Sequence, residues 1–143
     1  MPYRYLEDIA IADVAFEARG KTLVELFTAS ADALMNVMVE DLATIRSRET
    51  LEIGVAQEEA DLLLFDFLNE LIFHKDARRL LLRVSSLTIS RQDGRFSLRA
   101  FLSGEEIDPA RHRLNVDVKA VTLHRFRVEE TDTGWEATVV LDI

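Results

Sequence analysis

The sequence predicts an α+β fold, with a mainly antiparallel sheet and two α-helices packed on it. Two segments, 22–38 and 58–77, carry apolar residues at the spacing of a helix, and the second half alternates like strands joined by tight turns. The predicted order is β-β-α-β-α-β-β-β-β. Late strands that follow one another through short turns favour antiparallel pairing.

In the first half, we expect short strands over 3–7 and 14–19, the second of which ends at Gly20. Thr22 then begins a helix with Glu25 three residues later, the spacing of a capping box. The apolar positions of this helix fall mostly at helical spacing: Leu23, Leu26, Phe27, Leu34, Val37 and Met38.

A weakly alternating strand over 48–56 precedes the second helix, 58–77. Nine residues of its 61–73 segment are apolar, and Asp66, Asn69 and Glu70 form one narrow polar stripe. A helix this apolar is usually packed on two sides, here by the sheet and the first helix. The alternative is an exposed face that binds a partner, as in a chaperone-like module.

The second half predicts strands over 81–90 and 95–104 around an Asp93-Gly94 hairpin turn, then 114–123 continuing into 126–130. The last strand, 135–143, follows another turn, Asp132-Thr133-Gly134. Alternation places Trp135, Ala137, Val139, Leu141 and Ile143 on its core face, and Glu136, Thr138, Val140 and Asp142 on the other.

Composition limits the class of protein. The 143 residues, 48% apolar, predict one globular domain over 1–143. No apolar run approaches the ~20 residues of a membrane span, and no signal peptide is recognisable, so we expect a cytoplasmic protein without membrane association. The absence of cysteine excludes disulfides and thiolate metal sites.

The chain is acidic, with 17 Lys and Arg against 26 Asp and Glu and a net charge of −9. Nucleic-acid binding depends on neutralising phosphates with basic residues, so we expect little or no direct binding of RNA or DNA. The charge suits a basic partner protein or a divalent cation, or serves solubility alone.

The end of the sequence brings two carboxylates together, the side chain of Asp142 and the α-carboxylate of Ile143. Both are ionised at neutral pH and suit a hard cation such as Ca²⁺ or Mg²⁺. The alternative is a solvated strand end. Asp13 alone is an ordinary aspartate at a strand start.

Lys119 stands among valines on a predicted strand and shares a face with Asp117, so its ammonium must reach Asp117 or another anion. His112 and His124 have no second histidine at ligand spacing and no Ser or Cys nucleophile signature beside them. We therefore interpret both as structural or solvent-facing. The five scattered glycines form no phosphate-binding loop.

Taken together, several motifs make the chain resemble the archease family. The specific ones are the 118–124 run Val-Lys-Ala-Val-Thr-Leu-His and the terminal Asp142-Ile143. The resemblance also covers Asp13-Val14 with Phe16 and Gly20, the helix start at 22–27, the helix at 61–73 and the Asp-Pro-x-Arg-His motif at 108–112.

The resemblance implies that this chain is a protein cofactor and not a catalyst. Archeases activate the RtcB-type RNA ligase of tRNA splicing and RNA repair, promoting its guanylylation and multiple turnover. By resemblance, Asp13, Asp142 and Ile143 would bind a divalent metal, Ca²⁺ or Mg²⁺, and Lys119 would act in partner activation.

The chain departs from the family at one motif. Archeases usually have His-Thr-Ala-Asp-Val-Gly where this chain has Ala10-Ile11-Ala12-Asp13-Val14-Ala15. The carboxylate is kept, but the residues around it differ. The alternatives to ligase activation are the chaperone-like module, which would use the 61–73 helix, and a metal-dependent phosphoesterase that would use Asp13 and Asp142.

Overall fold

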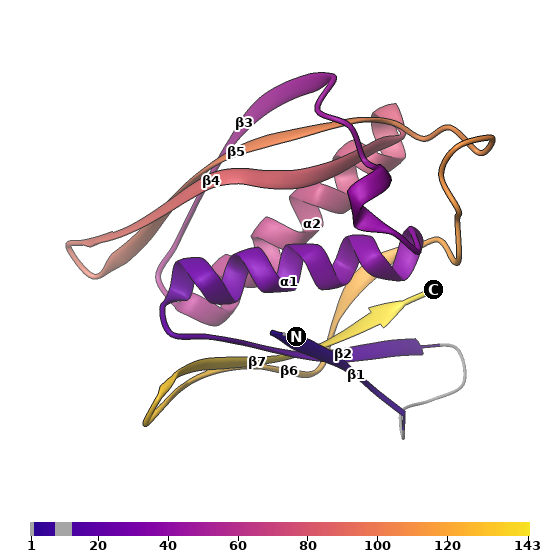
Figure 1. The fold of residues 1–143 in the computed structure, drawn as a ribbon. Coiled ribbons are helices and arrows are strands. Elements are labelled where there is room, and N and C mark those ends of the chain that lie inside the picture. Colours follow the sequence, from indigo (N-terminus) through magenta and orange to yellow (C-terminus); the bar gives the residue numbers. More distant parts are fainter. Residues whose placement is uncertain (1, 8–12) are drawn as a thin grey trace.

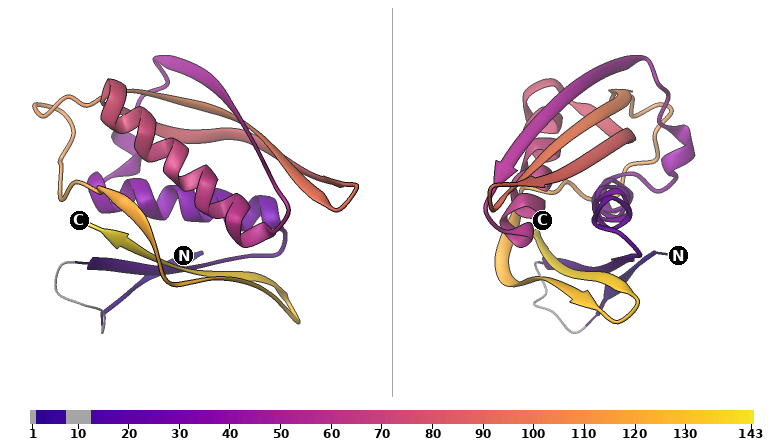
Figure 2. Two further views of the ribbon diagram at one scale, coloured as in Figure 1. Left: turned by 180° about the vertical axis from the view of Figure 1, so that it is seen from behind. Right: turned by 90° about the vertical axis from the view of Figure 1, so that its left-hand side faces the viewer.

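The protein consists of two antiparallel sheets that enclose two helices between them (Figure 1; Figure 2). The computed structural model describes residues 2–7 and 13–143. One sheet has four strands in the order β1 (Tyr3–Leu6), β2 (Asp13–Gly20), β7 (Gly134–Asp142) and β6 (Ala120–Thr131). The other has three, in the order β3 (Glu49–Gln57), β5 (Arg95–Glu106) and β4 (Leu80–Gln92).

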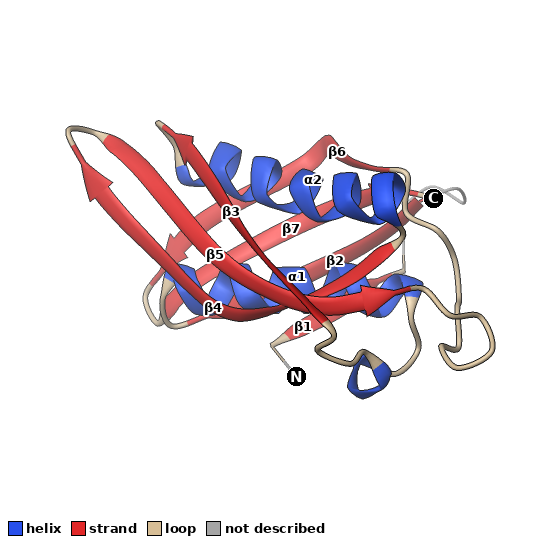
Figure 3. Ribbon diagram, turned by 90° about the horizontal axis from the view of Figure 1, so that it is seen from above, coloured by secondary structure: helices blue, strands red, loops and turns tan. Residues whose placement is uncertain are grey.

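The two helices are α1 (Leu23–Met38) and α2 (Ala60–Arg78). A short 3₁₀ turn, Leu42–Thr44, follows α1, and β3 precedes α2. The α+β class and the predicted element order are confirmed. The strands form two sheets instead of one, so the helices have a sheet on either side (Figure 3). Alternation along each strand identifies a buried face, but it does not say which strands share a sheet.

Helix α1 begins as the capping box predicts. The Thr22 hydroxyl accepts a hydrogen bond from the Glu25 N–H at 3.2 Å. In return, the Glu25 carboxylate accepts one from the N–H of Lys21 at 2.6 Å. These bonds satisfy donors that a helix start leaves without a partner, and they place α1 directly after β2.

Helix α2 packs against β3, β4, β6 and α1, which confirms the prediction of burial on two sides. Its buried residues are Leu63, Leu64, Phe67, Leu68, Leu71, Ile72 and Lys75. Leu62 and Phe73 stay exposed near the two ends, so little of its apolar surface remains for a partner. Within the described residues, neither helix is long and apolar enough to cross a membrane.

The predicted hairpin turn at Asp93-Gly94 is present, and both residues have positive φ, 53° and 74°. That is the backbone of a two-residue turn whose twist matches the flanking strands. Strand β6 is irregular in its middle: the register against β7 shifts between Thr122 and Arg127, and Arg125 has a φ of 55°. This break lies where the sequence predicted that one strand segment would continue into the next.

The face assignment of β7 is confirmed for its core side, because Ala137, Val139 and Leu141 are fully buried in the apolar cluster. Their partners across β2 belong to the same cluster; Phe16 lies opposite Val139, for example. On the other face, Val140 and its β2 partner Ala15 are also fully buried. The rest of that face of β7 is polar, with Glu136, Thr138 and Asp142.

The strand predicted over 114–123 is wrong in its first half, since β6 begins at Ala120. The preceding residues form part of a long connection, 107–119, which we call the β5–β6 loop. In the middle of this loop the backbone pairs with the end of α1: the N–H of Asn115 donates to the Met38 carbonyl at 2.9 Å, and Leu114 forms a bridge with Val39.

Candidate functional site

Asp13 and Asp142 are paired residues on the adjacent antiparallel strands β2 and β7. Side chains at paired positions point to the same face of a sheet, and their Cα atoms lie about 4.5–5.5 Å apart. The next pair, Val14 and Leu141, faces the core. The two aspartates therefore lie together on the face that points away from the helices, at the very end of the strand pair, and both are half-buried.

Lys119 reaches the same place from the other side of β7. Its backbone N–H donates a hydrogen bond to the carbonyl oxygen of Asp142 at 2.8 Å, and Ala120 is the residue paired with Asp142. The Lys119 side chain is exposed. Ile143 follows Asp142, half-buried, with its side chain packed on the apolar core.

The structure thus brings all four predicted site residues to one end of the four-stranded sheet, although they come from three distant segments. Ala10, Ile11 and Ala12 of the divergent motif lie outside the described residues. The donors of Asp13 and Asp142 are carboxylate oxygens, the ligands that Ca²⁺ and Mg²⁺ prefer. Across residues 2–7 and 13–143, no three His, Cys, Asp or Glu side chains gather at metal-binding distances. A complete donor set would need the Ile143 carboxylate.

Of the two alternatives for Lys119, Asp117 or another anion, the structure does not show the first, because Asp117 is bound by a residue of α2. Lys75 Nζ donates to Asp117 Oδ1 at 2.6 Å and to the Val118 carbonyl at 2.8 Å. It also contacts Asp76 Oδ1 at 2.5 Å. Among the residues that the structure describes, the Lys119 ammonium forms no ion pair.

Sequence reasoning missed Lys75, although its spacing contains the signal. It follows Leu68, Leu71 and Ile72 at helical intervals and so belongs to the buried face of α2. Only 4% of the Lys75 side chain is exposed. Burial by itself lowers the pKa of a lysine, but the hydrogen bonds and charges of Asp117 and Asp76 outweigh it and raise the pKa of Lys75 above its ordinary value.

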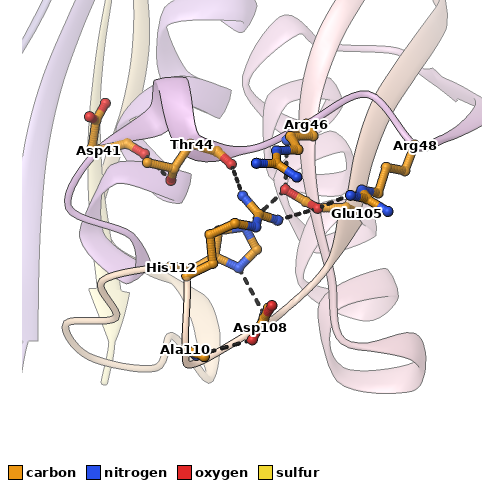
Figure 4. Close-up of polar contacts among 9 residues, drawn as sticks. Asp41, Thr44, Arg46, Arg48, Glu105, Asp108, Ala110 and His112 are labelled. Carbon is orange, nitrogen blue, oxygen red and sulfur yellow. Dashed lines mark hydrogen bonds and ion pairs between the residues drawn. The ribbon is translucent and has the colours of Figure 1, made fainter.

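A second polar cluster holds the start of the β5–β6 loop (Figure 4). Its centre is the buried carboxylate of Glu105, which accepts hydrogen bonds from the Arg46 N–H at 2.7 Å and from His112 Nε2 at 3.0 Å. The Arg111 guanidinium forms a close ion pair with it, and Arg48 Nε lies 3.4 Å away. Burial raises the pKa of a carboxyl group, yet these partners prevail and hold the pKa of Glu105 at about 2.

His112 in this cluster is structural, as the sequence reasoning expected. Its Nδ1 accepts a hydrogen bond from the Asp108 N–H at 2.8 Å, which leaves Nε2 to donate to Glu105. The ring is buried, and both its nitrogens are used. Arg111 continues the cluster to the Thr44 carbonyl at 2.6 Å. The Asp-Pro-x-Arg-His motif therefore closes the loop onto the segment after α1.

A groove of about 720 Å³ lies at the opposite end of the four-stranded sheet. It is lined in part by Lys21, Val24, Thr28 and Trp135, and Trp135 pairs with Gly20, at the far end of β2 from Asp13. None of the predicted site residues lines this groove. The candidate site is a patch at a strand end and not an enclosed pocket.

Fold and site together define a small α+β protein, in which two antiparallel sheets enclose two helices and a carboxylate pair lies open at a strand end. The sequence profile of the Archease protein family (MTH1598/TM1083) matches residues 3–143. The chain belongs to this family.

Several relatives agree with this assignment. Protein archease from Methanosarcina acetivorans is 34% identical over 99% of this chain and 95% of its own length. Protein archease from Pyrococcus furiosus is 35% identical over 92% and 93%, respectively.

Two solved structures share the fold. The solution structure of Methanobacterium thermoautotrophicum protein 1598 superposes with a TM-score of 0.86 at 30% identity, covering 99% of both chains. The crystal structure of an archease from Thermotoga maritima, named a possible chaperone, gives a TM-score of 0.63 at 21% identity, over 96% of this chain and 97% of its own.

Proposed function

We propose that this protein is the activator of an RtcB-type RNA ligase, promoting ligase guanylylation and multiple turnover in tRNA splicing or RNA repair. Membership of the archease family supports this proposal at the level of the family. One observation links the proposal to particular residues: Asp13, Lys119 and Asp142 lie together at one exposed strand end.

An open patch suits a surface that meets another protein. A catalyst usually encloses its substrate in a cleft, whereas the candidate site lies outside the groove beside Trp135. The net charge of −9 favours a basic protein surface as the partner and disfavours direct contact with RNA. In this proposal the ligase performs the chemistry, and this cytoplasmic chain acts as its protein cofactor.

The donor set fits a hard divalent cation. Asp13 and Asp142 would hold it with the Ile143 carboxylate as third ligand, and all three groups offer oxygen. When bound, Ca²⁺ or Mg²⁺ would supply a positive charge that organises the acidic strand end. The β2–β7 pairing holds the two aspartates on one face, and the buried Leu141 and the partly buried Val14 beside them restrict their movement.

Lys119 has a separate role in this proposal. Its backbone is tied to Asp142, while its exposed ammonium is free to pair with a phosphate or a carboxylate on the ligase. A lysine beside carboxylates gives the patch both signs of charge. Such a pattern fixes the orientation of a partner more than it adds affinity.

The test is ligase guanylylation measured with labelled GTP in the presence of this protein. Asp13→Asn, Asp142→Asn and Lys119→Ala should each reduce activation at least about tenfold, the usual scale for loss of a ligand or a charged contact. Asp93→Asn on the hairpin turn and Lys21→Ala at the opposite end of the sheet are matched controls and should activate normally. Full activation by folded Asp142→Asn and Lys119→Ala variants would refute the proposal.

A further inference from the structure

The β5–β6 loop, which ends at Lys119 beside Asp142, contains no helix or strand. Contacts with other parts of the chain hold it at three positions along its length. The Glu105 cluster holds its start through Arg111 and His112. The end of α1 holds its middle: the Glu40 N–H donates to the Arg113 carbonyl, and the Asn115 N–H donates to Met38. The last fastening is at residues 117–118, directly before Lys119 (orange in Figure 1).

The contact at residues 117–118 is made by one buried ammonium group, that of Lys75. An ammonium has three N–H donors, and Lys75 Nζ has three acceptors around it: the carboxylates of Asp76 and Asp117 and the Val118 carbonyl. All its donors are satisfied, so Lys75 has none left for a ligand or substrate. Its side chain is also shielded from solvent, whereas the Asp117 side chain is 66% exposed.

This anchor and the site meet at a single peptide unit. The Val118 carbonyl that Lys75 binds belongs to the peptide unit whose N–H, on Lys119, donates to the Asp142 carbonyl. One planar peptide unit is therefore held at both ends, by α2 on one side and by β7 on the other. Releasing the Lys75 end leaves the single Lys119–Asp142 bond to hold the segment.

We infer that Lys75 is a positioning residue, whose buried ammonium fixes the Val118–Lys119 peptide unit and so places Lys119 beside the Asp13–Asp142 pair. Its effect on ligase activation rests on the proposed function. Its effect on the position of Lys119 does not, because the hydrogen bonds that carry it lie within this chain.

Amide hydrogen exchange measures the placement directly. The Lys119 N–H is protected only while it is bonded to Asp142, so its exchange rate reports how often the segment detaches. In Lys75→Met, which keeps a chain of similar length without the charge, the Lys119 amide should exchange at least about tenfold faster relative to the amides of Val139 and Leu141.

Two further variants make the result decisive. Asp117→Asn removes the negative charge of one acceptor at the exposed side, cannot disturb the core, and should accelerate Lys119 exchange by a smaller factor. Arg83→Met removes a different ion pair, with Asp32, between β4 and α1, and should leave Lys119 exchange unchanged. If Lys119 exchange in Lys75→Met and Asp117→Asn equals that of the wild type, or if Arg83→Met accelerates it equally, the inference is wrong.

Ligase guanylylation separates this inference from the proposed function. Lys75→Met should lower activation, and the Lys75→Met/Lys119→Ala double variant should be no worse than Lys119→Ala alone, because both changes act through one side chain. Faster Lys119 exchange with unaltered activation would support the positioning role of Lys75 and contradict the role proposed for Lys119. Unaltered exchange would overturn the positioning role, whatever the activation.

Discussion

Asp142 is held by two neighbours at once: Asp13 is its paired residue on β2, and Lys119 donates a backbone hydrogen bond of 2.8 Å to its carbonyl oxygen. The backbone of Asp142 is therefore held in place from both sides, and this fixes the position of its carboxylate. Leu141, one residue earlier, is fully buried on the opposite face. Adjacent residues of β7 thus serve stability and the candidate site separately.

This separation predicts opposite consequences for two neighbouring substitutions. Leu141→Ala should lower the free energy of unfolding by roughly 2–4 kcal/mol, because it leaves a cavity in the core. Asp142→Asn should change it by less than about 1 kcal/mol, since the side chain is half-buried at a strand end. Urea denaturation measures both, and equal losses would show that the faces are assigned wrongly.

Gly104 on β5 should tolerate no side chain. A Cβ added there would lie 1.8 Å from the Leu81 carbonyl oxygen on β4. Gly104→Ala should therefore cost at least about 3 kcal/mol, because backbone must move to relieve the clash. Gly54→Ala in the same sheet is the control, since its nearest neighbour would be 3.8 Å away. Thermal unfolding of the two variants tests the difference, and similar melting temperatures would contradict it.

Glu105 should make the stability depend on pH in the acid range. Its pKa is lowered from 4.5 to about 2 in the folded protein. A group with a depressed folded pKa contributes stability that is complete above its unfolded pKa and is lost as the pH falls through its folded pKa. This contribution should therefore be complete above about 4.5 and disappear as the pH falls from there to about 2.

The Glu105→Gln variant isolates that contribution. At neutral pH it should be destabilised by roughly 3 kcal/mol, the scale for breaking a buried charged pair. The difference in unfolding free energy between the wild type and Glu105→Gln should then shrink as the pH falls through that window. A difference that stays constant with pH would mean that the Glu105 charge does not stabilise the fold.

The role of the Ile143 carboxylate predicts an asymmetry between tags. Residues appended after Ile143 replace the carboxylate by a neutral amide and should weaken Ca²⁺ binding, measured by calorimetry, because affinity rises with the ligand charge around a hard cation. Ligase activation should fall as well. The same tag at the N-terminus is the control, and equal Ca²⁺ affinities of the two tagged proteins would exclude the carboxylate as a ligand.

Much of the fold was predictable because it depends on local patterns. The Thr22 cap, the turn at Asp93-Gly94 and the core face of β7 are read from neighbouring residues, and the structure confirms each of them. Local patterns do not determine long-range register. The pairing of Asp13 with Asp142 joins opposite ends of the sequence, and only the resemblance to archeases grouped these residues before the structure showed them together.

The errors also have a physical cause. Residues 114–119 have the alternation of a strand, but the end of α1 binds the backbone of Asn115 and Lys75 binds the Val118 carbonyl, so the segment meets a sheet only at Lys119. Lys75 also binds Asp117, which was one of the two partners considered for Lys119. The Glu105 cluster joins residues 105, 111 and 112 to the backbone N–H of residue 46, which lies 59 positions before Glu105 in the sequence. Tertiary contacts, and not local propensity, determine the structure of the 114–119 segment, the partner of Asp117 and the Glu105 cluster.

The position of β7 has a consequence for synthesis on the ribosome. It is the last strand in sequence, yet it lies between β2 and β6 inside the four-stranded sheet. While residues 134–142 are still in the exit tunnel, β2 and β6 have no strand to join them, and the core of that sheet stays open. The emerging chain keeps one edge of β2 unpaired until residues 134–142 have left the tunnel. The candidate site, which needs β2, β6 and β7 together, can therefore form only after that point.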